Sequence, residues 1–180
     1  MMTEIRLNKM YNRYAGIIAN DIVDSDKGVC VSFWCQFCPH RCKACHNPET
    51  WSKDGGKLLP EDYIEKVINY IEENGIKRNL SILGGEPLAE CNREIILPLL
   101  VEVKKRCNWC KVYLWTGYVY EHIIKEPLVE DILKYVDVLI DGPFVLAQRD
   151  ISLFLKGSTN QRVIDVKKTM ESNEIVLYHE

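Results

Sequence analysis

Two early stretches of the chain are apolar runs rich in β-forming residues, and a later stretch repeats apolar residues at helical spacing. The segments Tyr14–Val23 and Val29–Trp34 are rich in β-branched residues, and the polar run 24–28 between them ends in glycine. Two such runs separated by a turn predict two β-strands. Further on, apolar residues at 64, 67, 68 and 71 predict a helix that begins near Pro60 and ends at Gly75.

The rest of the chain alternates short apolar runs with helical patterns. Asn92 is the expected N-cap of a long helix that Pro98 is expected to kink. We expect strands at 80–83, 112–115 and 136–140, weaker strands at 162–166 and 175–178, and helices at 92–106, 120–125 and 128–135.

Strands that alternate with helices indicate right-handed βαβ units and a parallel sheet. A chain of 180 residues is short for a full eight-unit barrel, which needs ~250 residues. We therefore expect an α/β fold with mostly parallel strands, arranged as an open, partial (β/α) barrel. No linker or internal repeat divides the sequence, so residues 1–180 are expected to form a single domain.

Three cysteines, Cys38, Cys42 and Cys45, lie in the loop expected after the second strand. Spacings of three residues and then two allow one short loop to surround a single metal cluster. The loop supplies three thiolates, whereas a closed cubane or a structural zinc site needs four ligands. An iron–sulfur cluster held in this way has one iron that is open to a substrate.

Other metal sites fit the same loop. Cys35 lies three residues before Cys38, so the four cysteines could form a closed site for zinc or a plain ferredoxin-type cluster. His40 or His46 could instead complete a zinc site with three cysteines and one histidine. The local spacing leaves these alternatives open.

A second motif, Gly84-Gly85-Glu86-Pro87, follows the apolar run 80–83. Two glycines at the end of a strand allow a ligand to approach the backbone closely, although an ordinary strand-to-helix turn has the same composition. A C-x3-C-x2-C loop followed by this motif resembles the radical S-adenosylmethionine (SAM) superfamily. The resemblance implies a [4Fe–4S] cluster on Cys38, Cys42 and Cys45, with SAM bound to the open iron and its methionyl end against the glycines.

Further segments of the sequence narrow the resemblance to one family within this superfamily. They are His46–Trp51, Trp115–Tyr118, Asp141–Phe144 and Lys156–Arg162. In this order and at this chain length they resemble the activating proteins of anaerobic (class III) ribonucleotide reductases. That resemblance implies reductive cleavage of SAM and removal of a hydrogen atom from a glycine of the large reductase subunit. It also implies an electron donor such as flavodoxin or ferredoxin.

The sequence departs from the family pattern at three positions. Ala44 stands where the family usually has glycine, and Phe37 where a small residue commonly precedes the first cluster cysteine. His46 stands where many relatives place an aromatic residue beside the adenine, and its imidazole can still stack. SAM contacts are expected from Ala44, Cys45 and His46 together with residues 84–87. No catalytic residue is expected beyond the cluster and SAM.

Charge and composition exclude several classes of function. The net charge is −3 and the basic residues are scattered, which argues against nucleic-acid binding. The apolar run 95–101 is far shorter than the ~20 residues that cross a bilayer. The chain starts without an apolar signal core and has eight cysteines, so we expect a cytoplasmic protein with no membrane association. Of the remaining cysteines, Cys107 and Cys110 are expected to be structural, and Cys30 and Cys91 are expected to be small, buried hydrophobic residues.

Three alternative functions fit the same motifs. The protein could activate another glycyl-radical enzyme, such as pyruvate formate-lyase, or could be a small-molecule radical SAM enzyme. A protein of a different class, a non-catalytic zinc or iron–sulfur module that binds a partner, would also use the cysteine loop. Larger activases usually carry a ferredoxin-like insert with its own cysteines, and the sequence has no such set, which favours the reductase as partner.

Overall fold

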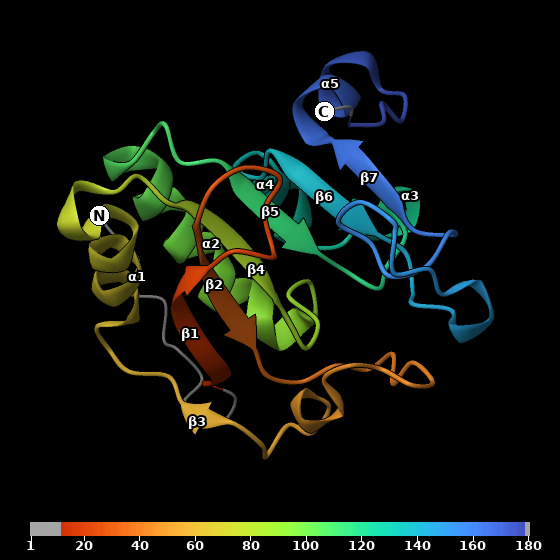
Figure 1. Cartoon of the computed structure of the whole chain (residues 1–180), viewed down its shortest axis with the longest axis horizontal. Helices are drawn as coiled ribbons and strands as arrows, with labels where there is room; N and C mark the ends of the chain where they lie inside the picture. The colour runs from red at the N-terminus through yellow and green to blue at the C-terminus, as the bar shows by residue number, and fades with distance from the viewer. Residues whose placement is uncertain (1–11, 179–180) are drawn as a thin grey trace.

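The computed structural model describes residues 12–178, which are built around a seven-stranded sheet in the order β3-β1-β2-β4-β5-β6-β7 (Figure 1). The strands are β1 (Arg13–Asp21), β2 (Cys30–Cys35), β3 (Lys57–Leu58), β4 (Asn79–Gly84), β5 (Val112–Trp115), β6 (Val138–Asp141) and β7 (Arg162–Asp165). Strands β2, β4, β5 and β6 are parallel, whereas β1, β3 and β7 pair antiparallel with their neighbours. The predicted α/β fold with an open sheet is confirmed, and the strands are parallel in the middle of the sheet but antiparallel at both of its edges.

Helices cover one face of this sheet. They are α1 (Tyr63–Glu72), α2 (Glu90–Arg106), α3 (Tyr120–Ile123), α4 (Val129–Leu133) and α5 (Val166–Ser172). Single turns η1 (Pro48–Thr50), η2 (Glu73–Gly75) and η3 (Leu146–Gln148) lie in the connections. Three residues of the predicted apolar stripe of α1 are buried and the fourth, Ile64, is half-buried, in the same core as Phe33 of β2 and Leu99 of α2. No helix in residues 12–178 is both long enough and apolar enough to span a bilayer.

The opposite face of the sheet is covered by loops. Side chains alternate along a strand, so Phe33 points into the helix-covered core while Ser32 faces the other way. The Ser32 hydroxyl donates a hydrogen bond to the carboxylate of Asp21. The β1–β2 connection, residues 22–29, folds over this second face (Figure 1). Its residue Asp24 accepts a hydrogen bond from Ser81 of β4 through its main-chain oxygen.

The prediction that Asn92 is the N-cap of this helix is wrong. Helix α2 begins at Glu90 with Ala89 in the cap position, and Asn92 lies inside the helix with 2% of its surface exposed. Its side-chain amide donates to the carbonyl oxygens of Gln36, at 2.9 Å, and Glu86, at 2.8 Å. The side chain of Asn92 therefore satisfies two buried carbonyl groups beside the helix, which lie 56 and 6 positions away in the chain.

The C-terminal elements also differ from the sequence prediction. The expected strand 175–178 contributes one isolated bridge, between Leu177 and Ile164. Strand β7 ends at Asp165, whose carboxylate accepts from Lys168 N at 3.0 Å and so caps α5, a helix that the sequence pattern did not predict.

Pro98 lies inside α2, and the helix continues through it.

Candidate functional site

The site lies where the parallel strands end. Loops that follow β2, β4, β5 and β6 meet at one edge of the sheet, as expected for the carboxyl ends of parallel strands. Together they line a cavity of ≈ 180 Å³. Its lining includes Cys38, Cys42 and Cys45 from the loop after β2, Gly84, Gly85 and Glu86 after β4, Thr116 and Gly117 after β5, and Gly142 after β6. The two motifs that are about forty residues apart in the sequence thus face the same space.

The three loop cysteines share this space without converging on a point. Burial raises the pKa of the Cys38 thiol to about 11. The sulfur of Cys45 accepts a hydrogen bond from Asn47 N at 3.4 Å, and Cys45 N donates to Cys42 O at 3.0 Å. Among the described residues, no group of three or more His, Cys, Asp or Glu side chains is arranged to hold a single metal ion.

Cys35 is separated from the other three cysteines. It is the last residue of β2, is 2% exposed and packs in the hydrophobic core beside Phe33. Burial raises the pKa of the Cys35 thiol well above its usual value. Its side chain is absent from the lining of the cavity that contains Cys38, Cys42 and Cys45. The geometry therefore gives a set of three cysteines and leaves Cys35 in the core.

Glu86 joins three loops at the site. Its carboxylate is 1% exposed and accepts from Leu88 N at 2.9 Å, Thr116 Oγ1 at 2.7 Å and Gly117 N at 2.7 Å. Nε2 of His40, which lies between Cys38 and Cys42 in the chain, is 2.8 Å from Glu86 Oε2. A buried carboxylate needs such partners, and here they come from the loops after β2, β4 and β5. The motif indicated that Glu86 belongs to the site, but its partners could not be identified from the sequence.

The other histidine of the cysteine loop lies in a different environment. His46 is exposed, and its ring centroid is 6.0 Å from that of Phe144, which follows β6. The His40 ring instead packs edge-on against Tyr118 at 4.5 Å. The two imidazoles thus link the cysteine loop to two different neighbouring loops.

The two glycines are needed because another backbone packs against them. A Cβ atom on Gly85 would lie 2.4 Å from Phe37 O, and one on Gly84, where φ is +99°, would lie 2.9 Å from Cys35 N and O. Gly85 N donates to Cys35 O at 2.9 Å, and Glu86 N donates to Phe37 O at 2.7 Å. The sequence suggested close approach by a ligand, whereas the structure shows close approach by the start of the cysteine loop.

Three residues of the cysteine loop have positive φ angles. They are Phe37 at 75°, Arg41 at 47° and Ala44 at 59°. This region of φ favours glycine. Glycine would adopt these angles at positions 37 and 44 without the strain that a Cβ atom brings.

A larger cavity of ≈ 660 Å³ adjoins the first and shares Cys45, Trp115 and Phe144 with it. His46 and Trp34 line this second cavity, and Trp51 lines the first. The indole N–H groups of Trp34 and Trp51 are buried and have no hydrogen-bond partner within the described residues. An unsatisfied buried donor costs about 1–3 kcal/mol, and a polar ligand would remove that cost. The two cavities together therefore suit a ligand with polar groups beside the three thiols.

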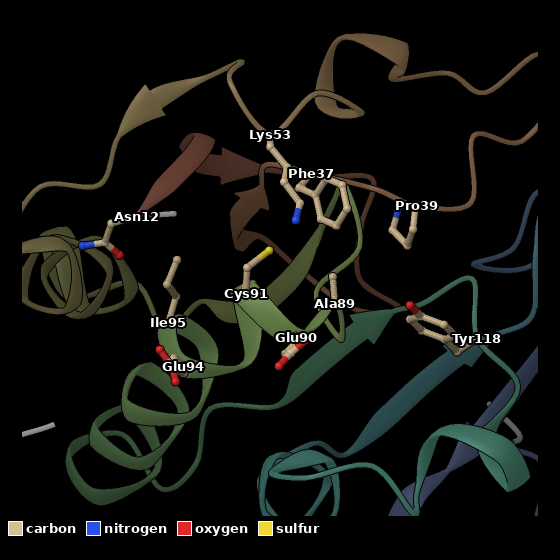
Figure 2. A pocket seen from close by; sticks show the side chains of 10 residues that line it. All are labelled: Asn12, Phe37, Pro39, Lys53, Ala89, Glu90, Cys91, Glu94, Ile95 and Tyr118. Atoms are coloured by element: carbon tan, nitrogen blue, oxygen red, sulfur yellow. The ribbon is translucent and has the colours of Figure 1, made fainter. Parts of the chain in front are cut away.

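A third cavity, of ≈ 450 Å³, lies on the other side of the cysteine loop (Figure 2). Phe37 lines it together with Cys91 and Glu90 of α2, and Lys53 Nζ lies 4.6 Å from the centroid of the Phe37 ring. The expectation that Cys91 is buried is wrong, since its thiol is half-buried and points into this cavity (Figure 2). Cys30 is buried as expected, and Cys107 and Cys110 are buried too, which agrees with a structural role.

Comparison with known proteins places the chain in a family. The model of a 4Fe-4S single cluster domain matches residues 25–164. A Haemophilus influenzae protein is 36% identical over 149 residues, which cover 82% of this chain and 94% of the relative. An Escherichia coli K12 protein is 31% identical over 154 residues (85% and 96%), and one of phage T4 is 36% identical over 126 residues (70% and 77%). Since each of these relatives is named an anaerobic ribonucleoside-triphosphate reductase-activating protein, this chain belongs to the family of anaerobic ribonucleoside-triphosphate reductase-activating proteins.

Proposed function

We propose that this protein activates an anaerobic ribonucleotide reductase by forming a glycyl radical on its large subunit. The observation that carries the proposal is the shared cavity, in which the thiols of Cys38, Cys42 and Cys45 face Gly84, Gly85 and Glu86. When bound there, a [4Fe–4S] cluster and SAM would supply an electron and a deoxyadenosyl radical that removes a hydrogen atom from the glycine.

The residues of the chain would hold and orient these groups. The three thiols would lose their protons to bind iron, and the N–H of Asn47 would stabilise the charge on Cys45. Ala44, His46 and residues 84–87 would surround SAM, whose polar groups could accept from the unpartnered indole N–H of Trp34 or Trp51. Fixed geometry and exclusion of water, and not acid–base catalysis, are the contributions expected of the protein.

The proposal extends to fold and partners. We propose that the open sheet is a partial (β/α) barrel of the radical SAM type and that residues 1–180 form one such domain. An electron donor such as flavodoxin or ferredoxin would reduce the cluster. The second cavity is open to the surface, so the glycine-bearing segment of the reductase could complete it and exclude water.

Cluster ligation can be tested by substitution of each cysteine. Protein with Cys38→Ala, Cys42→Ala or Cys45→Ala should lose the iron, the sulfide and the visible absorbance gained on anaerobic reconstitution. Cys35→Ala is the matched control, and it should retain the cluster because that thiol packs in the core. Loss of the cluster in the Cys35 variant would favour a closed four-cysteine site, and bound zinc without sulfide would favour a non-catalytic module.

The activity can be tested by electron paramagnetic resonance. Anaerobic incubation with SAM, a reductant and the cognate reductase subunit should produce a glycyl-radical doublet on that subunit, and no doublet should form without SAM. Gly85→Val should abolish the response of the reduced cluster to SAM, since its side chain would collide with Phe37 O. Efficient activation of pyruvate formate-lyase, with no activation of the reductase, would contradict the proposed partner.

A further inference from the structure

Two neighbouring loops at the site carry more positive than negative charge. Residues 38–47 contain no Asp or Glu, and residues 142–161 contain one, Asp150, although the chain as a whole has a net charge of −3. The first loop carries Arg41 and Lys43 on either side of Cys42, and the second carries Arg149. All three basic side chains are exposed, and none forms an ion pair within residues 12–178. We call Arg41, Lys43 and Arg149 the basic patch.

An apolar surface lies between the two loops. Lys43 lines a shallow cavity of ≈ 430 Å³ together with Phe144 and Leu146 of the second loop. Leu146 is 40% exposed. The contact between His46 and Phe144, with ring centroids 6.0 Å apart, independently places the loops side by side. An exposed apolar centre with a charged rim is the usual composition of a protein–protein contact.

The other side of the cysteine loop has the opposite character. The cavity between the start of that loop and α2 is lined by Glu90 and Glu94 and by one basic residue, Lys53 (Figure 2). Glu90 also lines the next cavity along, together with Glu126 and Arg93, which lie 3.7 Å apart as an ion pair. Acidic residues outnumber basic ones around these cavities, so an acidic partner would be attracted to the basic patch and not to this side.

We propose that the basic patch and the apolar surface beside it are the docking site of the electron donor, and that the donor presents an acidic face. The inference rests on the proposed function. Electron transfer weakens steeply with distance, and Arg41 and Lys43 are the direct neighbours of the ligand Cys42. In this step the donor is oxidised by one electron and the cluster is reduced by one electron, with no atom transferred. Redox complexes of this kind are small and transient, so a few charges can decide their formation.

The test reverses the three charges. The variant with Arg41→Glu, Lys43→Glu and Arg149→Glu is compared with a control carrying Lys27→Glu, Lys57→Glu and Lys125→Glu, which makes the same change of charge at exposed positions outside the two loops. The first measurement is the Kd for oxidised flavodoxin, an acidic one-electron protein donor. The second is the rate of cluster reduction by reduced flavodoxin and by photoreduced deazaflavin, a small donor that needs no docking site.

We expect the patch variant to bind flavodoxin roughly tenfold more weakly or worse at low ionic strength, with a matching loss of reduction rate. The difference should shrink as salt is added, and reduction by deazaflavin should be unchanged. The Kd for flavodoxin and the reduction rate of the control variant should stay within about twofold of the wild-type values, because its changed charges lie away from the docking site and are screened by salt. Replacing the same three residues with glutamine should give an intermediate Kd.

Two outcomes would overturn the inference. One is a patch variant that binds flavodoxin and is reduced by it as fast as the wild type. The other is normal reduction by flavodoxin with loss of glycyl-radical formation, which would assign the patch to the reductase. Failure of the proposed function would be visible separately, because the wild type would then not cleave SAM even with photoreduced deazaflavin.

Discussion

The two faces of the sheet are held in different ways. The helix-covered face is apolar, with Phe33 and Leu99 both at 1% exposure or less. The loop-covered face has a smaller apolar cluster around Tyr113 and Ile140 and is reinforced by polar contacts, in which Asp26 accepts from Lys111 Nζ at 2.8 Å and from the hydroxyls of Tyr113 and Tyr178. Apolar burial needs only the right periodicity, whereas this network needs particular side chains to meet. The site lies at the edge where both faces end.

The largest effect is expected on the helix-covered face. Leu99→Ala removes a fully buried side chain from α2 and should lower the free energy of unfolding by about 2–5 kcal/mol, measured by urea denaturation. Ser81→Ala on the loop-covered face, which deletes one hydrogen bond to Asp24 O, should cost only about 1 kcal/mol. Equal losses for the two variants would contradict the distinction between the faces.

The contacts that hold the loops together at the edge of the sheet can be tested by substitution of Glu86. Glu86→Gln should destabilise the protein by about 1–3 kcal/mol because a buried site with four donors loses its carboxylate. It should also loosen the cysteine loop, which His40 ties to this carboxylate, so reconstituted protein should lose iron faster to a chelator. Glu94→Gln on the exposed side of α2 is the control and should change neither quantity. Unchanged iron release in the Glu86 variant would show that the contact does not hold the loop.

A third experiment uses pH to probe the loop-covered face. Burial opposes ionisation of Asp26, but bonds from Lys111, Tyr113 and Tyr178 outweigh it and hold the pKa at about 2. The stability that Asp26 contributes is therefore present above about pH 4 and lost as the pH falls toward 2. Asp26→Asn should cost about 1 kcal/mol at pH 7 and much less near pH 2.

Asp24 should behave in the opposite way. Burial, reinforced by Asp21, raises the pKa of Asp24 to about 7, so its ionisation disfavours the folded state as the pH rises from about 4 to 7. Asp24→Asn should therefore raise the melting temperature at pH 8 and leave it nearly unchanged at pH 4. The same direction of change in both variants would contradict the assigned pKa shifts.

The smallest effect is expected in the cysteine loop. Ala44 has a φ of 59°, so Ala44→Gly relieves backbone strain but adds freedom to the unfolded chain. The net result should be a gain of at most about 1 kcal/mol in urea denaturation. Ala147→Gly in η3 is the control, and it should destabilise because that residue does not have a positive φ. Destabilisation of both variants would mean that Ala44 is not strained.

The difference between the faces also explains what the sequence could predict. The stripe on α1 and the short apolar strands could be predicted from periodicity. The position of the site could be predicted because its motifs directly follow predicted strands, whose carboxyl ends meet at one edge of the sheet. The partners of Asp26 lie 85, 87 and 152 positions away, and no local pattern connects such residues. Asn92 failed as a cap for the same reason, because its buried partner Gln36 O lies 56 positions earlier.

The glycine motif extends the sheet beyond its strands. The β2–β4 pairing ends at Cys35 and Gly84, yet the amides of Gly85 and Glu86 continue it with bonds to Cys35 O and to Phe37 O of the cysteine loop. Hydrogen exchange at these two amides then requires β2 and β4 to separate, so it should be slow even before iron is bound. Lys43 and Ala44 lie outside this ladder, and their amides should exchange quickly until the cluster is in place. Loading of the cluster would thus order one half of a site whose other half is already fixed by the sheet.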